Sequence, residues 1–210
     1  MKHLPNIFSF VRVLCSPIIF VLILMAAIDS ASMGILMKWA FGLFVFAACT
    51  DWVDGTLARA MNATSELGAK LDLLADKLLV GVTLLGIIIS NLVVLERKYW
   101  PLAIAIGAFL LISTSVRDYY VTDLRNKGAA FGLKMPASFL AKSKTAVIMA
   151  GIGIYLAAWP FDKGELLYVG AIATFVGALM SLFTGFQYYS AFIKAKANFN
   201  TDIKVIETKH

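Results

Sequence analysis

The chain has 210 residues, 60% of them hydrophobic, and its mean hydropathy is +0.81. Soluble domains are nearer half apolar, so this composition argues against a soluble domain and indicates a protein whose solvent is the lipid bilayer. The formal net charge of +6 comes from basic residues scattered over the predicted connections. That scatter argues against a nucleic-acid partner and favours an origin in membrane topology and attraction to anionic membrane lipids.

Six apolar segments are candidates for crossing a bilayer, which takes about 20 mostly apolar residues in a helix. Backbone groups in lipid must be paired within the protein, and the segments lack the alternation of barrel strands, so each is expected to be a helix. We therefore predict an all-α integral membrane protein with six transmembrane helices, followed by a loose cytoplasmic tail at 195–210. The predicted spans are Ile7–Ile28, Met33–Thr50, Leu71–Leu95, Trp100–Leu124, Thr145–Trp159 and Leu166–Ile193.

Basic residues mark one side of the predicted bundle. The connections at 58–70 and 125–144 and the tail are rich in lysine and arginine, whereas the opposite side carries Arg97, Lys98 and Lys163. Under the positive-inside rule the richer side faces the cytoplasm. Both termini are therefore expected to be cytoplasmic.

Four aspartates lie where the second predicted span ends and the third begins. Asp51 and Asp54 are three residues apart, and Asp72 and Asp76 are four apart, so on a helix each pair lies on one face. The short connection makes the two spans antiparallel neighbours, and the four carboxylates are expected to converge just inside the cytoplasmic interface. An ionised aspartate at the centre of a span costs about 2.5–3.5 kcal/mol, so this cluster needs a compensating charge.

Divalent cations are well suited to offset the charge of this cluster. Carboxylate oxygens without Cys or His favour Mg²⁺, Mn²⁺ or Ca²⁺ over zinc, and four carboxylates are enough for two ions of the kind that clamp a phosphoryl group in transfer. Gly55, Ala58 and Gly68 leave room for a ligand beside the backbone, and the fork of Arg59 suits a phosphate. Two alternatives remain open at this point: an ion pathway or transporter site, and structural ion pairs with Lys77 or Arg59.

The residues around the aspartates form a longer pattern. It runs Asp51-x-x-Asp54-Gly55-x-x-Ala58-Arg59, then eight residues, then Gly68-x-x-x-Asp72-x-x-x-Asp76. This pattern resembles the signature of the CDP-alcohol phosphotransferases at all eight fixed positions. Enzymes of that family are six-helix membrane proteins that move a phosphatidyl or similar group from a CDP-linked donor onto an alcohol and release CMP. The likeness covers about residues 5–150, and the last two spans match only in hydropathy.

The resemblance implies a cofactor and roles for individual residues. Two divalent cations, Mg²⁺ or Mn²⁺, would be held by Asp51, Asp54, Asp72 and Asp76, and Asp76 would be the base that deprotonates the acceptor hydroxyl. Residues 1–194 would form one membrane domain of the family. The residues expected to bind the CDP-linked donor are Asn6, Gly55, Ala58, Arg59 and Gly68.

Two further segments indicate the acceptor alcohol. The start LPNIFSFVRVLCSPI, with its Pro-Asn pair, Arg12 and Pro17, resembles bacterial phosphatidylglycerophosphate synthases, as does the region SVRDYYVTDLRNKG. The resemblance implies CDP-diacylglycerol as donor and glycerol 3-phosphate as acceptor. A phosphorylated acceptor needs a group of cations, for which we expect Arg117, Arg125 and Lys142, while Lys144 is a further basic residue on the same side.

Several alternatives concern this acceptor site. Asp118 or Asp123 is an alternative partner of Arg117, and the chain has Val-Arg-Asp at 116–118 where the subfamily usually has Ala-Arg-Glu. Other members of the family use phosphatidylglycerol, giving cardiolipin, or inositol phosphate, and an ion-coupled transporter is the alternative from another class of protein. The expected setting is a homodimer in the bacterial inner membrane, with its active site facing the cytoplasm.

Overall fold

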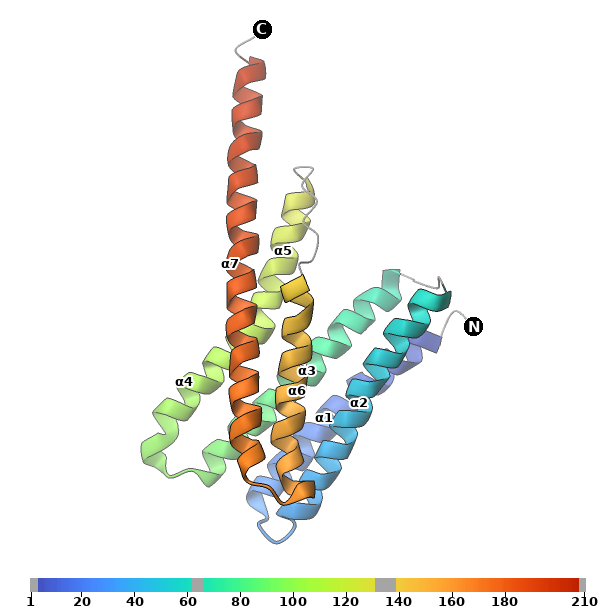
Figure 1. Ribbon diagram of the computed structural model, residues 1–210, viewed down its shortest axis with the longest axis vertical. Coiled ribbons are helices and arrows are strands. Elements are labelled where there is room, and N and C mark those ends of the chain that lie inside the picture. The colour runs from blue at the N-terminus through green and yellow to red at the C-terminus, as the bar shows by residue number, and fades with distance from the viewer. Residues whose placement is uncertain (1–3, 62–65, 131–138, 208–210) are drawn as a thin grey trace.

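The computed structural model describes residues 4–61, 66–130 and 139–207. Within these ranges the chain is helical apart from short turns, and no strand occurs (Figure 1). The 3-10 turn η1 (Arg97–Tyr99) and the π-helical turn η2 (Ile112–Val116) precede and follow helix α4. The α-helices are α1 (Leu4–Ile28), α2 (Met33–Met61), α3 (Glu66–Val94), α4 (Trp100–Leu111), α5 (Arg117–Ala130), α6 (Phe139–Phe161) and α7 (Glu165–Glu207).

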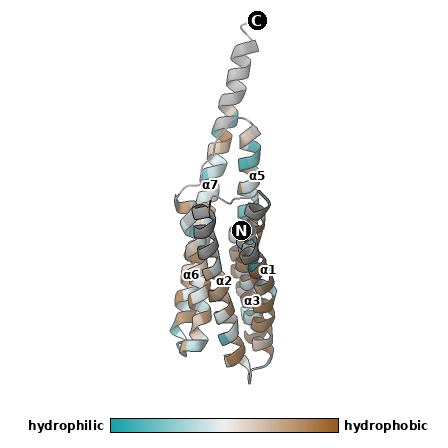
Figure 2. Cartoon of the chain, turned by 90° about the vertical axis from the view of Figure 1, so that its right-hand side faces the viewer, coloured by the Kyte–Doolittle hydropathy of each residue, from teal (hydrophilic) through white to brown (hydrophobic). Residues whose placement is uncertain are grey.

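Six stretches of these helices are long and apolar enough to cross a membrane, which confirms the prediction of six helices of this kind. Each overlaps one predicted span, and η1, α4, η2 and α5 together make the fourth. Hydropathy is highest over one half of the bundle and is lower along α5 (Figure 2). The stretches are Phe8–Ile28, Met33–Thr50, Leu74–Val94, Arg97–Ala129, Ser143–Phe161 and Glu165–Lys194.

The helix termini that were predicted to be cytoplasmic all lie at one end of the bundle. The amino end of α1, the facing ends of α2 and α3, the facing ends of α5 and α6, and the carboxyl end of α7 all lie there (Figure 1). The turns after α1, α3 and α6 lie at the other end. This arrangement agrees with the predicted order of spans, while the direction of the bundle in a membrane stays a prediction.

Helix α1 lies between α2 and α3. It packs along both of them, whereas α2 and α3 touch each other little. The prediction that the second and third spans are neighbours was therefore wrong over most of their length, although they converge at their connected ends (Figure 1). The physical reason is that one face of α1, which includes the fully buried Ile19 and Ile23, packs into a core shared with side chains of both α2 and α3.

The bundle has two groups of helices that meet along a seam. In one group α1 packs with α2 and α3, and in the other α7 packs with α4, α5 and α6. The two groups meet where α2 packs on α6 and where α3 packs on α4. Small residues allow the closest approach within the second group, because a Cβ added at Gly151 would lie 2.6 Å from the backbone nitrogen of Thr174.

The last helix is longer than the sequence indicated. Helix α7 continues to Glu207 and extends past the rest of the bundle (Figure 1), so the prediction of a loose segment from residue 195 was wrong for the described part. Residues 195–207 contain no glycine or proline, and adding residues to a formed helix costs much less than starting one. A domain boundary at residue 194 stays a prediction.

Candidate active site

Arg12 of α1 joins the two aspartates of α3. Its Nη2 donates to Oδ1 of Asp72 and its Nη1 donates to Oδ1 of Asp76. The side chain of Arg12 is 0% exposed, whereas those of Asp72 and Asp76 are 43% and 27% exposed. The four-residue spacing therefore does place both carboxylates on one face, as predicted, and that face is turned toward a buried cation.

The polar residues of α1 form a short buried stripe. Ser9 lies one turn before Arg12 and its Oγ is 3.4 Å from Oδ1 of Asp72, while Ser16 lies one turn after Arg12 and donates to its carbonyl oxygen over 2.8 Å. In the sequence Arg12 was notable only as part of a family likeness, and its partners were not predicted. The available signal was a lone arginine in an apolar span, since such a residue is almost always paired.

For most of the other residues that were predicted to bind the CDP-linked donor or the metal ions, the structure does not describe the side chains. The side chains of 51–70, of Asn6 and of Lys142 are among those that are not described. The helical backbone places residues 51–61 in the last turns of α2 and residues 66–70 in the first turns of α3. Among the described residues no group of three or more metal-ligating side chains occurs, and two of the four predicted ligands are not among them.

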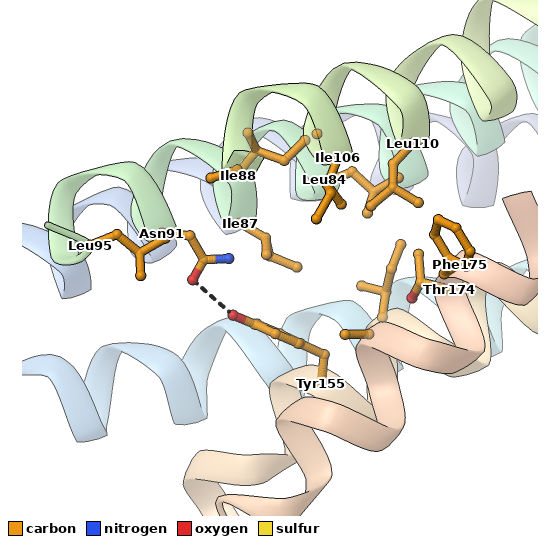
Figure 3. A pocket seen from close by; sticks show the side chains of 14 residues that line it. Leu84, Ile87, Ile88, Asn91, Leu95, Ile106, Leu110, Tyr155, Thr174 and Phe175 are labelled. Atoms are coloured by element: carbon orange, nitrogen blue, oxygen red, sulfur yellow. Dashed lines mark hydrogen bonds between the residues drawn. The ribbon is translucent and has the colours of Figure 1, made fainter. Parts of the chain in front are cut away.

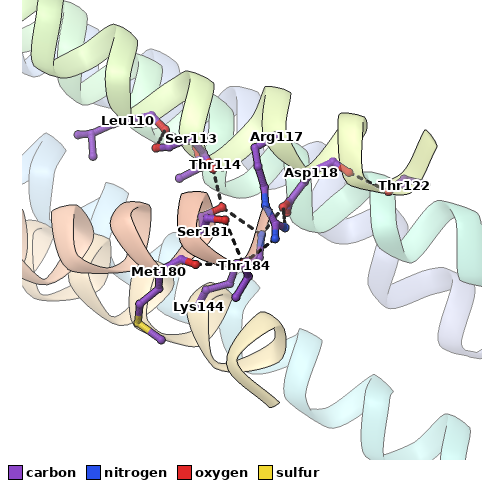
Figure 4. Close-up of polar contacts among 10 residues, drawn as sticks. All are labelled: Leu110, Ser113, Thr114, Arg117, Asp118, Thr122, Lys144, Met180, Ser181 and Thr184. Carbon is purple, nitrogen blue, oxygen red and sulfur yellow. Dashed lines mark hydrogen bonds and ion pairs between the residues drawn. The ribbon is translucent and has the colours of Figure 1, made fainter. Parts of the chain in front are cut away.

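A second charged cluster joins α5, α6 and α7. Arg117 Nη1 lies 2.8 Å from Oδ1 of Asp118, and Lys144 Nζ contacts the same oxygen (Figure 4). Arg117 Nη2 donates to Thr184 Oγ1 over 2.5 Å. The side chains of Arg117 and Lys144 are 8% and 5% exposed, and that of Asp118 is 25% exposed. Two buried cations thus share one carboxylate, which leaves this cluster with a net positive charge when all three groups are ionised.

A cavity of about 90 Å³ connects the two clusters. One wall comes from α3 and includes Asp76, and the opposite walls come from η2, α5 and α6 and include Asp118 and Lys144. A small polar molecule in this cavity would therefore touch Asp76 on one side and Lys144 on the other. The lining residues are Asp76, Lys77, Val80, Thr114, Ser115, Asp118, Lys144, Thr145 and Ile148.

The π-helical turn η2 forms part of this cavity wall. Within it the backbone N–H of Arg117 donates to the carbonyl of Ile112, five residues back, so the carbonyl of Ser113 is released from the usual ladder. Ser181 of α7 donates its Oγ–H to that carbonyl over 2.5 Å. Single π-turns are frequent at functional sites, and this one turns the start of α5 toward α7.

The predicted acceptor residues have separate surroundings. The open question about Arg117 is settled in favour of Asp118, because Asp123 pairs instead with Lys127 over 2.7 Å. Arg125 is exposed and lies eight residues beyond Arg117, or about 12 Å along the helix axis. Lys144, which was not among the predicted acceptor residues, lines the cavity. A common pocket of Arg117, Arg125 and Lys142 stays a prediction.

A larger cavity lies in the other half of the bundle, between α3, α4, α6 and α7. It measures about 240 Å³ and is lined mainly by apolar side chains. The polar contact drawn there is the hydroxyl of Tyr155 donating to Oδ1 of Asn91 over 3.1 Å (Figure 3). No acidic or basic side chain is among its lining residues, so a reaction of charged phosphates is better placed in the smaller cavity.

A family comparison decides which class of protein carries these clusters. The protein-family model described as CDP-alcohol phosphatidyltransferase matches residues 2–185 of the chain. The chain belongs to this family. The resemblance found in the sequence is confirmed, and the match extends beyond the predicted 5–150 through α6 and into α7. Membership also favours an enzyme over an ion-coupled transporter.

Three bacterial relatives of this CDP-alcohol phosphatidyltransferase share one name. Proteins called CDP-diacylglycerol–glycerol-3-phosphate 3-phosphatidyltransferase are 30% identical in Rickettsia typhi, over 91% of this chain and 97% of theirs, and 31% identical in Bacillus subtilis, over 90% and 95%. The protein of that name in Pseudomonas fluorescens is 32% identical over 99% of both chains.

Two solved structures have a similar fold. The phosphatidylinositol phosphate synthase of Mycobacterium tuberculosis in its apo form aligns with a TM-score of 0.58, at 19% identity, over 87% of each chain. The same enzyme with CDP-DAG bound aligns with a TM-score of 0.57, at 18% identity, over 88% of this chain and 85% of that one. At this identity the likeness supports the helix arrangement described above.

Proposed function

We propose that the protein transfers the phosphatidyl group of CDP-diacylglycerol to glycerol 3-phosphate, giving phosphatidylglycerophosphate and CMP. The observation that carries the proposal is the cavity with Asp76 on one wall and Lys144 and Asp118 on another. It offers a carboxylate base and a cationic anchor to one small molecule that bears both a hydroxyl and a phosphate. The shared name of the bacterial relatives supports the same reaction.

The chemical step needs a base beside the acceptor. The acceptor hydroxyl oxygen attacks the phosphorus that carries diacylglycerol, its proton passes to a carboxylate oxygen of Asp76, and the bond from that phosphorus to CMP breaks. A base within hydrogen-bond reach of the hydroxyl contributes typically about 10²–10⁴-fold to the rate. Asp76 lines the cavity and is partly exposed, so its position supports this role.

The aspartates are the proposed site of two divalent cations, Mg²⁺ or Mn²⁺. Such cations, when bound, supply a stabilising charge to the phosphoryl oxygens during transfer. The described part of the site fits them, because Asp72 and Asp76 present hard oxygen donors on one helix face and both side chains are partly exposed. Asp51 and Asp54 are the proposed further ligands. Arg12 orients the two carboxylates of α3 and offsets part of their mutual repulsion.

The proposal also assigns the residues that bind the donor and the place of the protein in the membrane. The family match covers every residue assigned to the donor, and these lie near the ends of α1, α2 and α3 at the same end of the bundle. We further propose a homodimer in the bacterial cytoplasmic membrane with the site on the cytoplasmic side, which six apolar helices and bacterial relatives support. The proposed donor residues are Asn6, Gly55, Ala58, Arg59 and Gly68.

The acceptor phosphate is proposed to meet the cluster of α5 and α6. Arg117 and Lys144 both contact Asp118, so a phosphate with close to two negative charges would complete the pairing of two cations. Arg125 and Lys142 are the proposed outer part of the same positive region. The reacting end of phosphatidylglycerol is uncharged, so it would bring no anion to the two cations of this cluster. This disfavours the synthesis of cardiolipin from phosphatidylglycerol.

An acceptor screen with the purified protein tests the proposal. CMP release from CDP-diacylglycerol is measured with glycerol 3-phosphate, glycerol, phosphatidylglycerol or inositol phosphate as acceptor, in the presence of Mg²⁺ or of a chelator. We expect turnover with glycerol 3-phosphate and Mg²⁺ and none with the chelator. Turnover with glycerol as good as with glycerol 3-phosphate contradicts the acceptor assignment, and no CMP release with any acceptor contradicts the enzyme assignment.

A further inference from the structure

We propose that Thr184 and Gly185 of α7 are positioning residues that set the affinity for the acceptor phosphate by holding the guanidinium of Arg117 in place. This inference rests on the proposed function. Neither residue lines the cavity between the clusters, and both would act through Arg117, which contacts the lining residue Asp118. The sixth span, which carries none of the family's charged signature, would then determine how well a phosphorylated acceptor binds.

The hydroxyl of Thr184 fixes one end of the guanidinium. It accepts a hydrogen bond from Arg117 Nη2 over 2.5 Å, in surroundings where Thr184 is 0% exposed (Figure 4). The same oxygen lies 3.0 Å from the carbonyl of Met180 and 2.9 Å from that of Ser181, to which it can donate its single proton. The helix backbone thus orients the hydroxyl so that a lone pair faces the arginine.

The absent side chain of Gly185 makes room for the arginine. A Cβ at this position would lie 2.9 Å from Nε and 3.2 Å from Cγ of Arg117, so the arginine stem lies directly against the backbone of α7. The buried Nε has no hydrogen-bond partner within the described part of the chain. The ring of Tyr188, one turn further along α7, lies 5.9 Å from Cζ and adds an attraction for the cation.

Through these contacts the position of α7 affects where Lys144 lies in the cavity wall. With Nη2 held by Thr184, Nη1 is directed at Asp118, which in turn holds Lys144 at the cavity wall. Ser181, one turn before Gly185, lies 3.4 Å from Nζ of the same lysine. One face of α7 therefore contacts both cations that are proposed to receive the phosphate.

A set of matched variants separates positioning from general packing. Thr184→Val keeps the shape but removes the hydroxyl, Thr184→Ser keeps the hydroxyl, and Gly185→Ala adds a methyl group against Arg117. Gly153→Ala of α6 is the control, because its added Cβ would meet the Phe44 ring at an ordinary 3.7 Å. Each variant is purified, and KM is measured separately for glycerol 3-phosphate and for CDP-diacylglycerol.

The expected result is a change in the acceptor alone. The Thr184 hydrogen bond is present with and without acceptor, so only its effect on the orientation of Arg117 reaches the KM. Thr184→Val should therefore raise the KM for glycerol 3-phosphate, by less than the roughly ten- to a hundredfold expected when a direct contact to a charged group is lost, and Gly185→Ala should show a rise in the same direction. The KM for CDP-diacylglycerol should stay unchanged in both. Thr184→Ser and Gly153→Ala should resemble the wild type. Inhibition by inorganic phosphate, competing with the acceptor, should weaken in parallel with the acceptor KM.

Two outcomes overturn the inference. Equal acceptor KM values for Thr184→Val and Thr184→Ser would show that the hydroxyl positions nothing, and a parallel rise of both KM values with a lower unfolding midpoint would show a packing role only. A wild-type protein that releases no CMP with glycerol 3-phosphate would instead contradict the proposed function. The stabilisation of the wild type and of Thr184→Val by inorganic phosphate would then decide whether this face of α7 supports an anion site.

Discussion

Replacing Arg12 with methionine should destabilise the protein strongly when divalent cations are removed. The side chain of Arg12 is fully buried and contacts both Asp72 and Asp76. Methionine fills a similar volume but removes the guanidinium that both carboxylates contact. The effect should therefore come from charge and hydrogen bonding rather than from an empty space.

The magnitude follows from the burial of the partners. Breaking a buried ion pair typically costs about 3–5 kcal/mol, because the remaining charge loses its partner. Asp72 is 43% exposed and Asp76 27% exposed, and water screens part of the charge that remains, so we take the lower limit of about 3 kcal/mol. At about 2–4 °C per kcal/mol for a chain of this length, the unfolding midpoint should fall by about 6–12 °C.

The assay is thermal unfolding in detergent, with a chelator and then with Mg²⁺. Mg²⁺ should stabilise Arg12→Met more than the wild type, because carboxylates without the guanidinium attract the metal more strongly. Lys127→Met is the control, since Lys127 pairs with Asp123 on the surface, at 63% and 44% exposure, and its loss should cost less than about 1 kcal/mol. Equal midpoints for Arg12→Met and Lys127→Met in the chelator would refute the reasoning.

Three further predictions concern turnover. Activity should fall to less than about a tenth of the wild type in each of the variants Asp51→Asn, Asp54→Asn and Asp72→Asn, because loss of a charged stabilising group costs several kcal/mol in the transition state. Higher activity in any of these variants counts against the two-metal site. Asp76→Asn should lower kcat far more than the affinity for CDP-diacylglycerol measured by calorimetry, and a parallel collapse of that affinity would make Asp76 chiefly a metal ligand. Arg117→Ala should raise the KM for glycerol 3-phosphate by roughly ten- to a hundredfold with little change for the donor, and an unchanged acceptor KM would exclude Arg117 from the acceptor site.

Features that depend on local spacing were predictable from the sequence. Long apolar runs indicated the six spans, and the four-residue spacing of Asp72 and Asp76 indicated their common helix face. The signature of aspartates, glycines and arginine indicated the family, because its residues lie within one stretch of the chain. Each of these inferences needs only the geometry of a single helix or of two consecutive helices.

Features that depend on contacts between distant helices were not predictable in this way. Arg12 meets partners 60 and 64 residues away, and Lys144 meets Asp118 across 26 residues. Hydropathy does not reveal which side of α1 faces α3, nor that α1 lies between its two neighbours. The contact of Thr184 with Arg117 spans 67 residues and involves an ordinary threonine in an apolar span, which no sequence pattern distinguishes from its neighbours.

The seam between the two helix groups has a consequence for how the surrounding lipid affects the enzyme. Asp76 belongs to the group of α1–α3, whereas Asp118 and Lys144 belong to the group of α5–α7, and the proposed site of the reaction is the cavity between them. Helices adjust to a bilayer that is too thin or too thick chiefly by changing their tilt. A change of tilt in one group relative to the other alters the width of this gap. Turnover should therefore depend on the chain length of the lipids around the protein, even when the CDP-diacylglycerol supplied to it is kept the same.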